Sequence, residues 1–203
     1  MNTTSPARRL SEDTRSDLLV ALVVVVALAL GWFYKSSLSS QTTPVADRNS
    51  QFSLAIPSRW LTHEPDAEAE DTFLIAENPA ANSVYKSAVT GRSFLLDPQS
   101  PTALDTLTDG LVQRHGDELT GYHLLDIQRR MIGGAEARVV EYAYVLQPID
   151  QPFRASVPVV VHGFDYLIYT PTQYWVLTFT ADELLVEKER EGFERVISSI
   201  QLP

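Results

Sequence analysis

Carboxylates form the densest cluster of side chains in this sequence that could do chemistry. Residues 64–71 read EPDAEAED and hold five of them, at Glu64, Asp66, Glu68, Glu70 and Asp71. Ca²⁺ takes about six to eight oxygen ligands, but this segment lacks the glycine and the ligand spacing of an EF-hand loop. A solvated acidic loop is the ordinary interpretation, and a docking patch for a basic partner is the functional one. We therefore take these five residues as a candidate docking patch.

The histidines and glycines carry no signature of an active site. No two of His63, His115, His123 and His162 stand at the H-x-x-x-H spacing, and H-E-x-x-H does not occur. Gly91–Leu95 begins like the G-x-S-x-G nucleophile elbow but lacks its last glycine. The sequence has no cysteine, which excludes disulfides, thiolate metal sites and a cysteine nucleophile. We therefore expect no enzyme activity, no cofactor and no metal site.

The charge of the chain is negative and unevenly placed. The formal net charge is −10. Four of the 16 basic residues and three of the 26 acidic residues precede residue 36, so residues 36–203 carry a net charge of −11. Such a domain repels the phosphates of nucleic acids and anionic lipid headgroups. We expect no nucleic-acid partner, whereas a basic protein surface or a divalent cation is electrostatically compatible.

An uncharged apolar run, LLVALVVVVALALGWFY, occupies residues 18–34. As a helix it would be about 26 Å long, a little less than a bilayer core of about 30 Å. A core helix of a soluble domain is disfavoured because no polar stripe exists. A cleaved signal peptide is the other alternative, but its apolar region usually has about 7–15 residues and no aromatic cluster before the cleavage site. The run predicts a single transmembrane helix with Trp32, Tyr34 and Lys35 as anchors at the membrane interface.

The charges beside this run predict its orientation. Arg8, Arg9 and Arg15 precede it, and Lys35 and Arg48 follow it, a bias that favours a cytoplasmic N-terminus. Residues 36–50 are rich in Ser and Thr and read as a flexible tether. The predicted order is a cytoplasmic segment 1–17, a transmembrane helix 18–34, a flexible linker 35–50 and a periplasmic, lumenal or external domain 51–203. The membrane would be a cell membrane or a thylakoid-like membrane.

Alternation of apolar and polar residues predicts β-strands through much of the remaining sequence. Gly133-Gly134 separates two such runs, which is a strong hairpin signal, and Pro171–Gln173 separates two more. The predicted strands are 51–56, 72–77, 84–96 with a hairpin or bulge at Gly91, 122–132, 135–147, a short strand within 157–163, 164–170 and 174–180.

Two predicted helices interrupt these strands. Ser100 can cap a helix whose first residue is Pro101. Thr180–Glu183 fits a capping box, and apolar residues at helical spacing follow it as far as Ile200. The order of strands, helix, strands and helix predicts an α+β fold with an antiparallel sheet and helices packed on it.

Several landmarks in this order are similar to one protein family. Phe52–Trp60 has the spacing F-x-x-x-x-P-x-x-W, the Gly133-Gly134 hairpin is followed by Tyr142, and Tyr174–Ala181 precedes the last helix. These landmarks resemble the PsbP family, which includes the extrinsic PsbP protein of photosystem II. The resemblance covers residues 51–203. It implies an α/β/α sandwich with a central antiparallel sheet, usually without enzyme activity, in proteins that bind or help to assemble a larger complex.

The predicted fold class is therefore α+β, with one N-terminal transmembrane helix followed by a PsbP-like α/β/α sandwich. The predicted function is that of a non-catalytic, membrane-anchored accessory subunit that docks on or stabilises a larger membrane protein complex, photosynthetic or respiratory. The anchor and the insert Ile149–Pro158 depart from the family's pattern, so the identity of the complex stays open. The alternative is a free-standing, membrane-tethered module that binds a small ligand or a cation.

Overall fold

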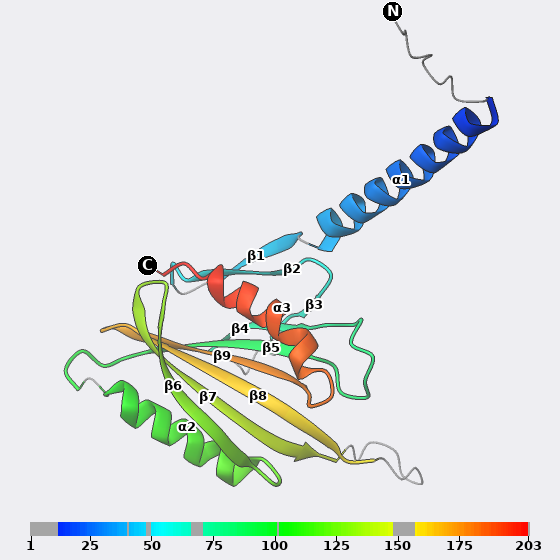
Figure 1. Ribbon diagram of the computed structural model, residues 1–203. Coiled ribbons are helices and arrows are strands. Elements are labelled where there is room, and N and C mark those ends of the chain that lie inside the picture. Colours follow the sequence, from blue (N-terminus) through cyan, green and yellow to red (C-terminus); the bar gives the residue numbers. More distant parts are fainter. Residues whose placement is uncertain are drawn as a thin grey trace, which may run out of the picture. The chain divides into compact units, whose positions relative to one another are not determined.

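The computed structural model describes residues 12–39, 41–47, 50–65, 71–100, 102–147 and 157–202, without the side chains of 12–18 and 34–39. The chain divides into two compact units, Met1–Gln41 and Thr42–Pro203. Helix α1 (Glu12–Ser39) belongs to the first unit, and the other helices and strands belong to the second (Figure 1). Each unit is described by itself.

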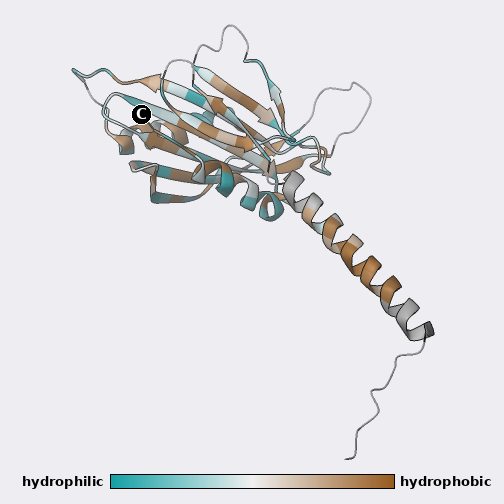
Figure 2. Ribbon diagram, turned by 90° about the horizontal axis from the view of Figure 1, so that it is seen from above, coloured by the Kyte–Doolittle hydropathy of each residue, from teal (hydrophilic) through white to brown (hydrophobic). Residues whose placement is uncertain are grey.

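Helix α1 is 28 residues long and apolar in its middle part. Its described side chains, at residues 19–33, are all exposed, and Figure 2 shows them as an apolar band. Polar residues complete the helix at both ends. The prediction of a transmembrane helix over residues 18–34 is wrong: no helix in the described part of the chain is long and apolar enough to cross a membrane.

Strands dominate the second unit and form two antiparallel sheets. In the smaller sheet, β1 (Thr42–Ala46) pairs with β2 (Ser53–Pro57). The larger sheet has seven strands in the order β3-β4-β5-β9-β8-β7-β6. These are β3 (Leu61–His63), β4 (Thr72–Glu77), β5 (Ala88–Leu95), β6 (His123–Ile132), β7 (Ala135–Leu146), β8 (Val159–Tyr169) and β9 (Gln173–Asp182).

Each face of the larger sheet carries its own layer (Figure 1). α3 (Val186–Ser198) and the β1–β2 sheet cover one face, and α2 (Leu104–Glu118) covers the other. The core beneath α3 is the larger one and is rich in aromatic residues. At its centre Phe52 stacks on Trp175, with ring centroids 4.9 Å apart, and both side chains are fully buried. Burial of large rings of this kind is a main source of stability.

The predicted fold class is wrong in its transmembrane helix and in its single sheet. Instead of a transmembrane helix followed by an α/β/α sandwich around one sheet, the described residues are mostly β-strands in two antiparallel sheets, with three helices. The second sheet arises in the stretch predicted as a flexible linker. Its residues Thr42–Ala46 form β1, and the Asp47 N–H donates to the Phe52 carbonyl at 2.9 Å to close the turn into β2. The Ser and Thr content of residues 36–50 does not indicate that part of this stretch pairs with another strand.

Two glycines explain where the predicted strands differ from the observed ones. Gly91 lies inside the single strand β5, and Gly163 joins the two segments predicted within 157–170 into one strand, β8. A Cβ on Gly91 would lie 2.6 Å from Cζ of Phe73, and a Cβ on Gly163 would lie 2.4 Å from Cζ of Tyr142. Each glycine therefore admits an aromatic ring from the adjacent strand, which is an established reason for glycine inside a sheet.

The predicted hairpin at Gly133-Gly134 is confirmed. The two glycines have φ values of 57° and 89° and connect β6 to β7. Positive φ at both central residues is the requirement of a type I′ turn, which suits the twist of a two-stranded ribbon.

The helix starts differ from the predictions. α2 begins at Leu104, and no side chain caps it, whereas Pro101 lies outside the described residues. The predicted capping box at Thr180–Glu183 does not start a helix, because β9 continues to Asp182 and α3 begins at Val186. The Asp182 carboxylate caps the tight turn between these two elements instead.

Candidate functional site

An apolar groove opens where the start of β8 lies beside the end of β9. Three of its apolar side chains are largely exposed, Leu184 at 89%, Val84 at 80% and Val157 at 80%, and Val160 is 46% exposed. The groove has a volume of 540 Å³. Single exposed apolar residues are normal on a protein surface, whereas a contiguous exposed group is a candidate interaction site. We call this feature the apolar groove.

Antiparallel pairing and one carboxylate position the apolar groove. Val161 pairs with Asp182, so the start of β8 and the turn after β9 lie side by side. The buried Asp182 carboxylate accepts hydrogen bonds from the Ser83 hydroxyl and, at 2.9 Å, from the Leu184 N–H. Because the Asp182 side chain binds both the segment of Ser83 and the turn of Leu184, it holds Val84 and Leu184 next to each other.

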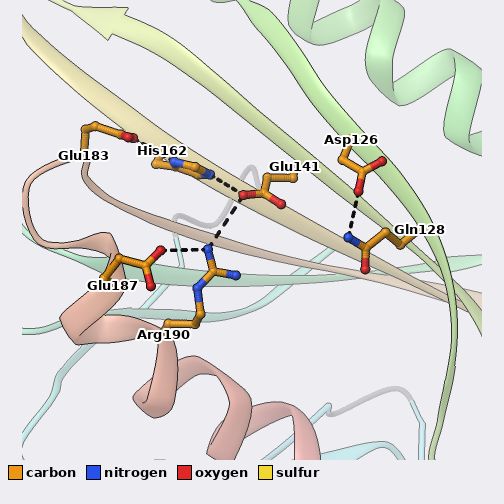
Figure 3. A network of polar contacts seen from close by, with 7 residues as sticks. All are labelled: Asp126, Gln128, Glu141, His162, Glu183, Glu187 and Arg190. Atoms are coloured by element: carbon orange, nitrogen blue, oxygen red, sulfur yellow. Dashed lines mark hydrogen bonds and ion pairs between the residues drawn. The ribbon is translucent and has the colours of Figure 1, made fainter.

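A cluster of charged side chains adjoins the apolar groove through Glu183, which lines the groove. Figure 3 shows the contacts within this cluster. His162 on β8 has a side chain that is only 9% exposed. Its Nδ1 lies 2.7 Å from Oε2 of Glu183, and its Nε2 lies 2.8 Å from Oε1 of Glu141. An ionised carboxylate only accepts hydrogen bonds, so both contacts form together only when both ring nitrogens carry a hydrogen. His162 thus joins Glu141 on β7 to Glu183 after β9.

Helix α3 adds two residues to this cluster. Arg190 Nη2 lies 3.2 Å from Oε1 of Glu187 and 3.8 Å from Oε1 of Glu141, and its guanidinium carbon lies 5.1 Å from the ring centroid of Phe164. We call the five residues the rim cluster: Glu141, His162, Glu183, Glu187 and Arg190. The rim cluster thus contains three carboxylates, one guanidinium group and one imidazole. The Asp126–Gln128 pair drawn in Figure 3 is a separate contact within β6.

A second histidine–carboxylate pair lies on the other face of the sheet, beneath α2. His115 Nε2 lies 2.6 Å from Oδ2 of Asp165, which is fully buried, and the Tyr142 hydroxyl donates to Oδ1 at 3.5 Å. Burial, aided by the charge of Asp165, raises the pKa of the Tyr142 hydroxyl far above its ordinary value and keeps it a donor. An Asp–His pair can orient a general base. No Ser, Thr or Lys side chain of the described residues hydrogen-bonds to His115, however, and the pair connects α2 to the sheet.

The predicted acidic docking patch is described only at its two ends. Glu64 is exposed after β3, and Asp71 is half-buried before β4. Asp66, Glu68 and Glu70 lie outside the described residues. The docking role of this patch therefore stays a prediction. Within the described ranges, no group of three or more His, Asp or Glu side chains is arranged to hold a metal ion.

The predicted membrane-interface anchors lie near the end of α1. Trp32 is 77% exposed, and the side chains of Tyr34 and Lys35 lie outside the described part of the chain. All three were predicted as flanks of a transmembrane helix, and no such helix is found among the described residues.

Sequence reasoning missed the rim cluster. Glu141 and Glu183 each stand 21 residues from His162, a separation that no local motif spans. The register of β7 and β8 places Glu141 opposite Phe164, two residues along the strand from His162. Only the strand order and the register bring these side chains together, and neither can be read from local patterns.

The arrangement of elements matches solved structures. The cyanobacterial PsbP (CyanoP) from Synechocystis sp. PCC 6803 has a TM-score of 0.61 to this chain at 9% identity, over 81% of this chain and 94% of that chain. The chain has a PsbP-like fold. LpqN of Mycobacterium tuberculosis, described as involved in cell envelope biogenesis, has a TM-score of 0.53 at 14% identity, over 80% of this chain and 91% of that chain. No protein-family model matches the sequence, and no curated protein matches it.

The resemblance to the PsbP family is thus confirmed at the level of the fold. Identities of 9% and 14% concern the fold alone and carry no residue role from one protein to another. A function for the PsbP-like unit, Thr42–Pro203, must therefore be argued from its own surface.

Proposed function

We propose that the PsbP-like unit is a non-catalytic accessory domain that docks on a larger protein assembly through the apolar groove and the adjoining rim cluster. The observation that carries this proposal is the exposure of Val84, Val157 and Leu184 around one groove of 540 Å³. Apolar surface removed from water contributes about 25 cal/mol per Å², so a partner side chain that fills the groove is stabilised there. A concave apolar centre with a polar rim is the usual anatomy of a protein–protein interface.

The charge beside the apolar groove indicates the chemistry of the partner. Glu183 and Glu187 have side chains that are 49% and 80% exposed, and residues 36–203 carry a net charge of −11. Such a field accelerates the approach of a basic surface and repels an acidic one. The partner is therefore a protein that presents an apolar side chain flanked by Lys or Arg. That this partner belongs to a photosynthetic or respiratory complex, and that the domain lies outside the cytoplasm, stay predictions from the sequence.

Co-purification from the cells that make the protein tests this proposal. The full chain carries a C-terminal tag, and the double variant Val84→Ser, Leu184→Ser is compared with Leu95→Ser, whose leucine is 81% exposed on β5 and does not line the groove. The unmodified chain and Leu95→Ser are expected to co-migrate with one assembly at a fixed ratio. The double variant is expected to lose at least about tenfold in recovery, equivalent to about 1.4 kcal/mol of binding free energy.

Thermal unfolding of the three purified proteins provides the control, because exposed side chains contribute little to stability. The proposal is contradicted if the unmodified chain migrates alone, or if the double variant co-purifies as well as Leu95→Ser. A fixed ratio alone does not identify the chemistry of the docking surface. Cross-linking of the purified assembly must therefore also join Glu183 to Lys or Arg of the partner.

A further inference from the structure

A small pocket lies between α2 and the larger sheet. Residues of β5 and β9, with Leu167 of β8, form one side of it, and the Gly110 side of α2 forms the other. Its volume is 130 Å³. This is close to the cavity of about 150 Å³ that accepts a benzene molecule in an engineered protein. The pocket therefore suits a ligand with one ring or a short branched chain.

Two arginines line this pocket in a chain with a net charge of −10. The guanidinium carbon of Arg92 lies 5.2 Å from the ring centroid of Phe94, and its ion pair with Asp71 is long, at 4.0 Å. Arg114 is exposed on α2 and forms no ion pair with any residue that the structure describes. Arginine presents a rigid fork of donors that matches a carboxylate, so the pair makes this pocket a candidate anion site.

Arg114 has acidic residues within reach on its own helix. Asp117 and Glu118 follow it at i+3 and i+4, the spacings at which helical ion pairs form. Neither pairs with it, and the Arg114 side chain lines the pocket instead. The pKa of the Tyr174 hydroxyl is raised by burial, and the charges of Arg114 and Arg92 both oppose that rise. Arg92, Arg114 and Tyr174 all line the same pocket.

The rest of the pocket lining is largely apolar. Phe94 and Tyr174 stack with centroids 4.8 Å apart and an angle of 16° between their planes, and Leu111, Leu167 and Val176 lie beside them. A hydrated inorganic anion gains only the contacts with the two arginines. An anion with an apolar body loses water from that body on binding and gains free energy.

We propose that this pocket binds a small organic carboxylate whose apolar body is about the size of a benzene ring. The carboxylate faces Arg92 and Arg114, and the body lies against Leu111 and Val176. The pocket shares no residue with the apolar groove, so the proposal stands apart from the docking proposal. Its ligand is an anion, in contrast to the cation that the acidic segment suggested.

Titration of the full chain with benzoate tests the proposal, with amide chemical shifts as the readout. We expect saturable binding with a dissociation constant of about 1 mM or tighter, and shift changes concentrated at Leu111, Tyr174 and Val176. Benzyl alcohol has the same ring without the charge, and is expected to bind at least about tenfold more weakly. Inorganic phosphate has the charge without the ring, and is expected not to saturate these shifts.

Three variants show whether the binding occurs in this pocket. Arg114→Gln is expected to weaken benzoate binding at least about fivefold. Arg129→Gln, a matched change at an exposed arginine of β6, is expected to leave it unchanged, since three strands separate β6 from β5. Gly110→Leu is expected to abolish it by filling the pocket. A Cβ at Gly110 meets no atom within 4 Å, and leucine favours a helix more than glycine does, so this variant folds.

The proposal is overturned if benzoate does not saturate, if benzyl alcohol or phosphate binds as tightly, or if Arg114→Gln binds benzoate as the unmodified chain does. None of these outcomes affects the co-purification that tests the docking proposal.

Discussion

Strand β8 carries a histidine–carboxylate contact on each face of the larger sheet, and the two differ in burial. Beneath α2, the Asp165 carboxylate is fully buried and meets His115 at 2.6 Å. At the rim of the apolar groove, His162 meets Glu141 and Glu183, whose side chains are 22% and 49% exposed. The two contacts therefore differ in the exposure of their carboxylates, whereas the histidine side chains are similarly covered, at 15% for His115 and 9% for His162.

This difference in burial gives the two histidine–carboxylate contacts different roles. A buried ion pair loses its hydration, so it is stable only when the two groups contact each other closely. Removal of one group then leaves the other buried without a partner. A rim pair keeps part of its water and can exchange protein contacts for contacts with a partner. We infer that the Asp165 pair fixes α2 to the sheet, and that the rim cluster is available for docking.

The largest predicted effect is that of Asp165→Ala. It leaves His115 and the Tyr142 hydroxyl without their carboxylate partner in a buried site, and is expected to lower the free energy of unfolding by about 3–5 kcal/mol. Urea unfolding followed by circular dichroism measures this loss. Asp126→Ala, at an exposed aspartate of β6, is the control and should change little. A loss as small as that of the control would show that the buried pair does not hold α2.

A smaller effect on stability is predicted for His162→Gln. Glutamine can donate to only one of the two rim carboxylates that His162 contacts, so the free energy of unfolding should fall by about 1–2 kcal/mol. The fraction that co-purifies with the partner should fall as well, because Glu141 and Glu183 are no longer held together by one side chain. His123→Gln, at an exposed histidine of β6, is the matched control. A stability loss as large as that of Asp165→Ala would remove the distinction between the two faces.

The smallest effect is predicted at the exposed pair of Arg130 and Glu194. Two hydrogen bonds of 3.0 and 2.7 Å join side chains that are both 42% exposed. Such pairs contribute about 0–1 kcal/mol, so Glu194→Gln should lower the free energy of unfolding by no more than that at pH 7. The hydrogen bonds from Arg130 lower the pKa of Glu194 from its ordinary value of 4.5.

The pH dependence of this pair follows from the sign of that shift. Because the folded pKa is depressed, the contribution of Glu194 is complete above the unfolded pKa and is lost as the pH falls through the folded pKa. The difference in unfolding free energy between the unmodified chain and Glu194→Gln should therefore shrink below about pH 4.5. Urea unfolding at pH 7 and pH 3 checks this, and a difference that grows toward acid pH would contradict it.

Local patterns predicted the strands well and their partners poorly. β4 occupies 72–77 as predicted, and the hairpin of β6 and β7 follows from Gly133-Gly134. Alternation and turn chemistry are local properties, which is why they succeed. The predicted strand boundaries near Gly91 and Gly163 were wrong. In the sequence, a glycine that makes room for a neighbouring ring cannot be distinguished from a glycine that ends a strand.

The candidate site could not be predicted for a related reason. Val84, Val157 and Leu184 come from three separate segments, and only the register of β8 on β9 and the Asp182 carboxylate bring them together. Each is an ordinary loop residue when taken alone. The apolar run at 18–34 was conspicuous by comparison, and it led to the transmembrane helix that the structure does not bear out.

Site-specific photocross-linking tests the docking claim most directly. A photoreactive phenylalanine replaces Val84 in the apolar groove or, as the control, Leu95 on β5, and cells that make each protein are illuminated before mass spectrometry. The account predicts that position 84 cross-links to one protein, at a surface that carries Lys or Arg beside an apolar side chain, and that position 95 does not. Equal cross-linking at both positions, or none at position 84, would contradict the claim that the apolar groove is the docking surface.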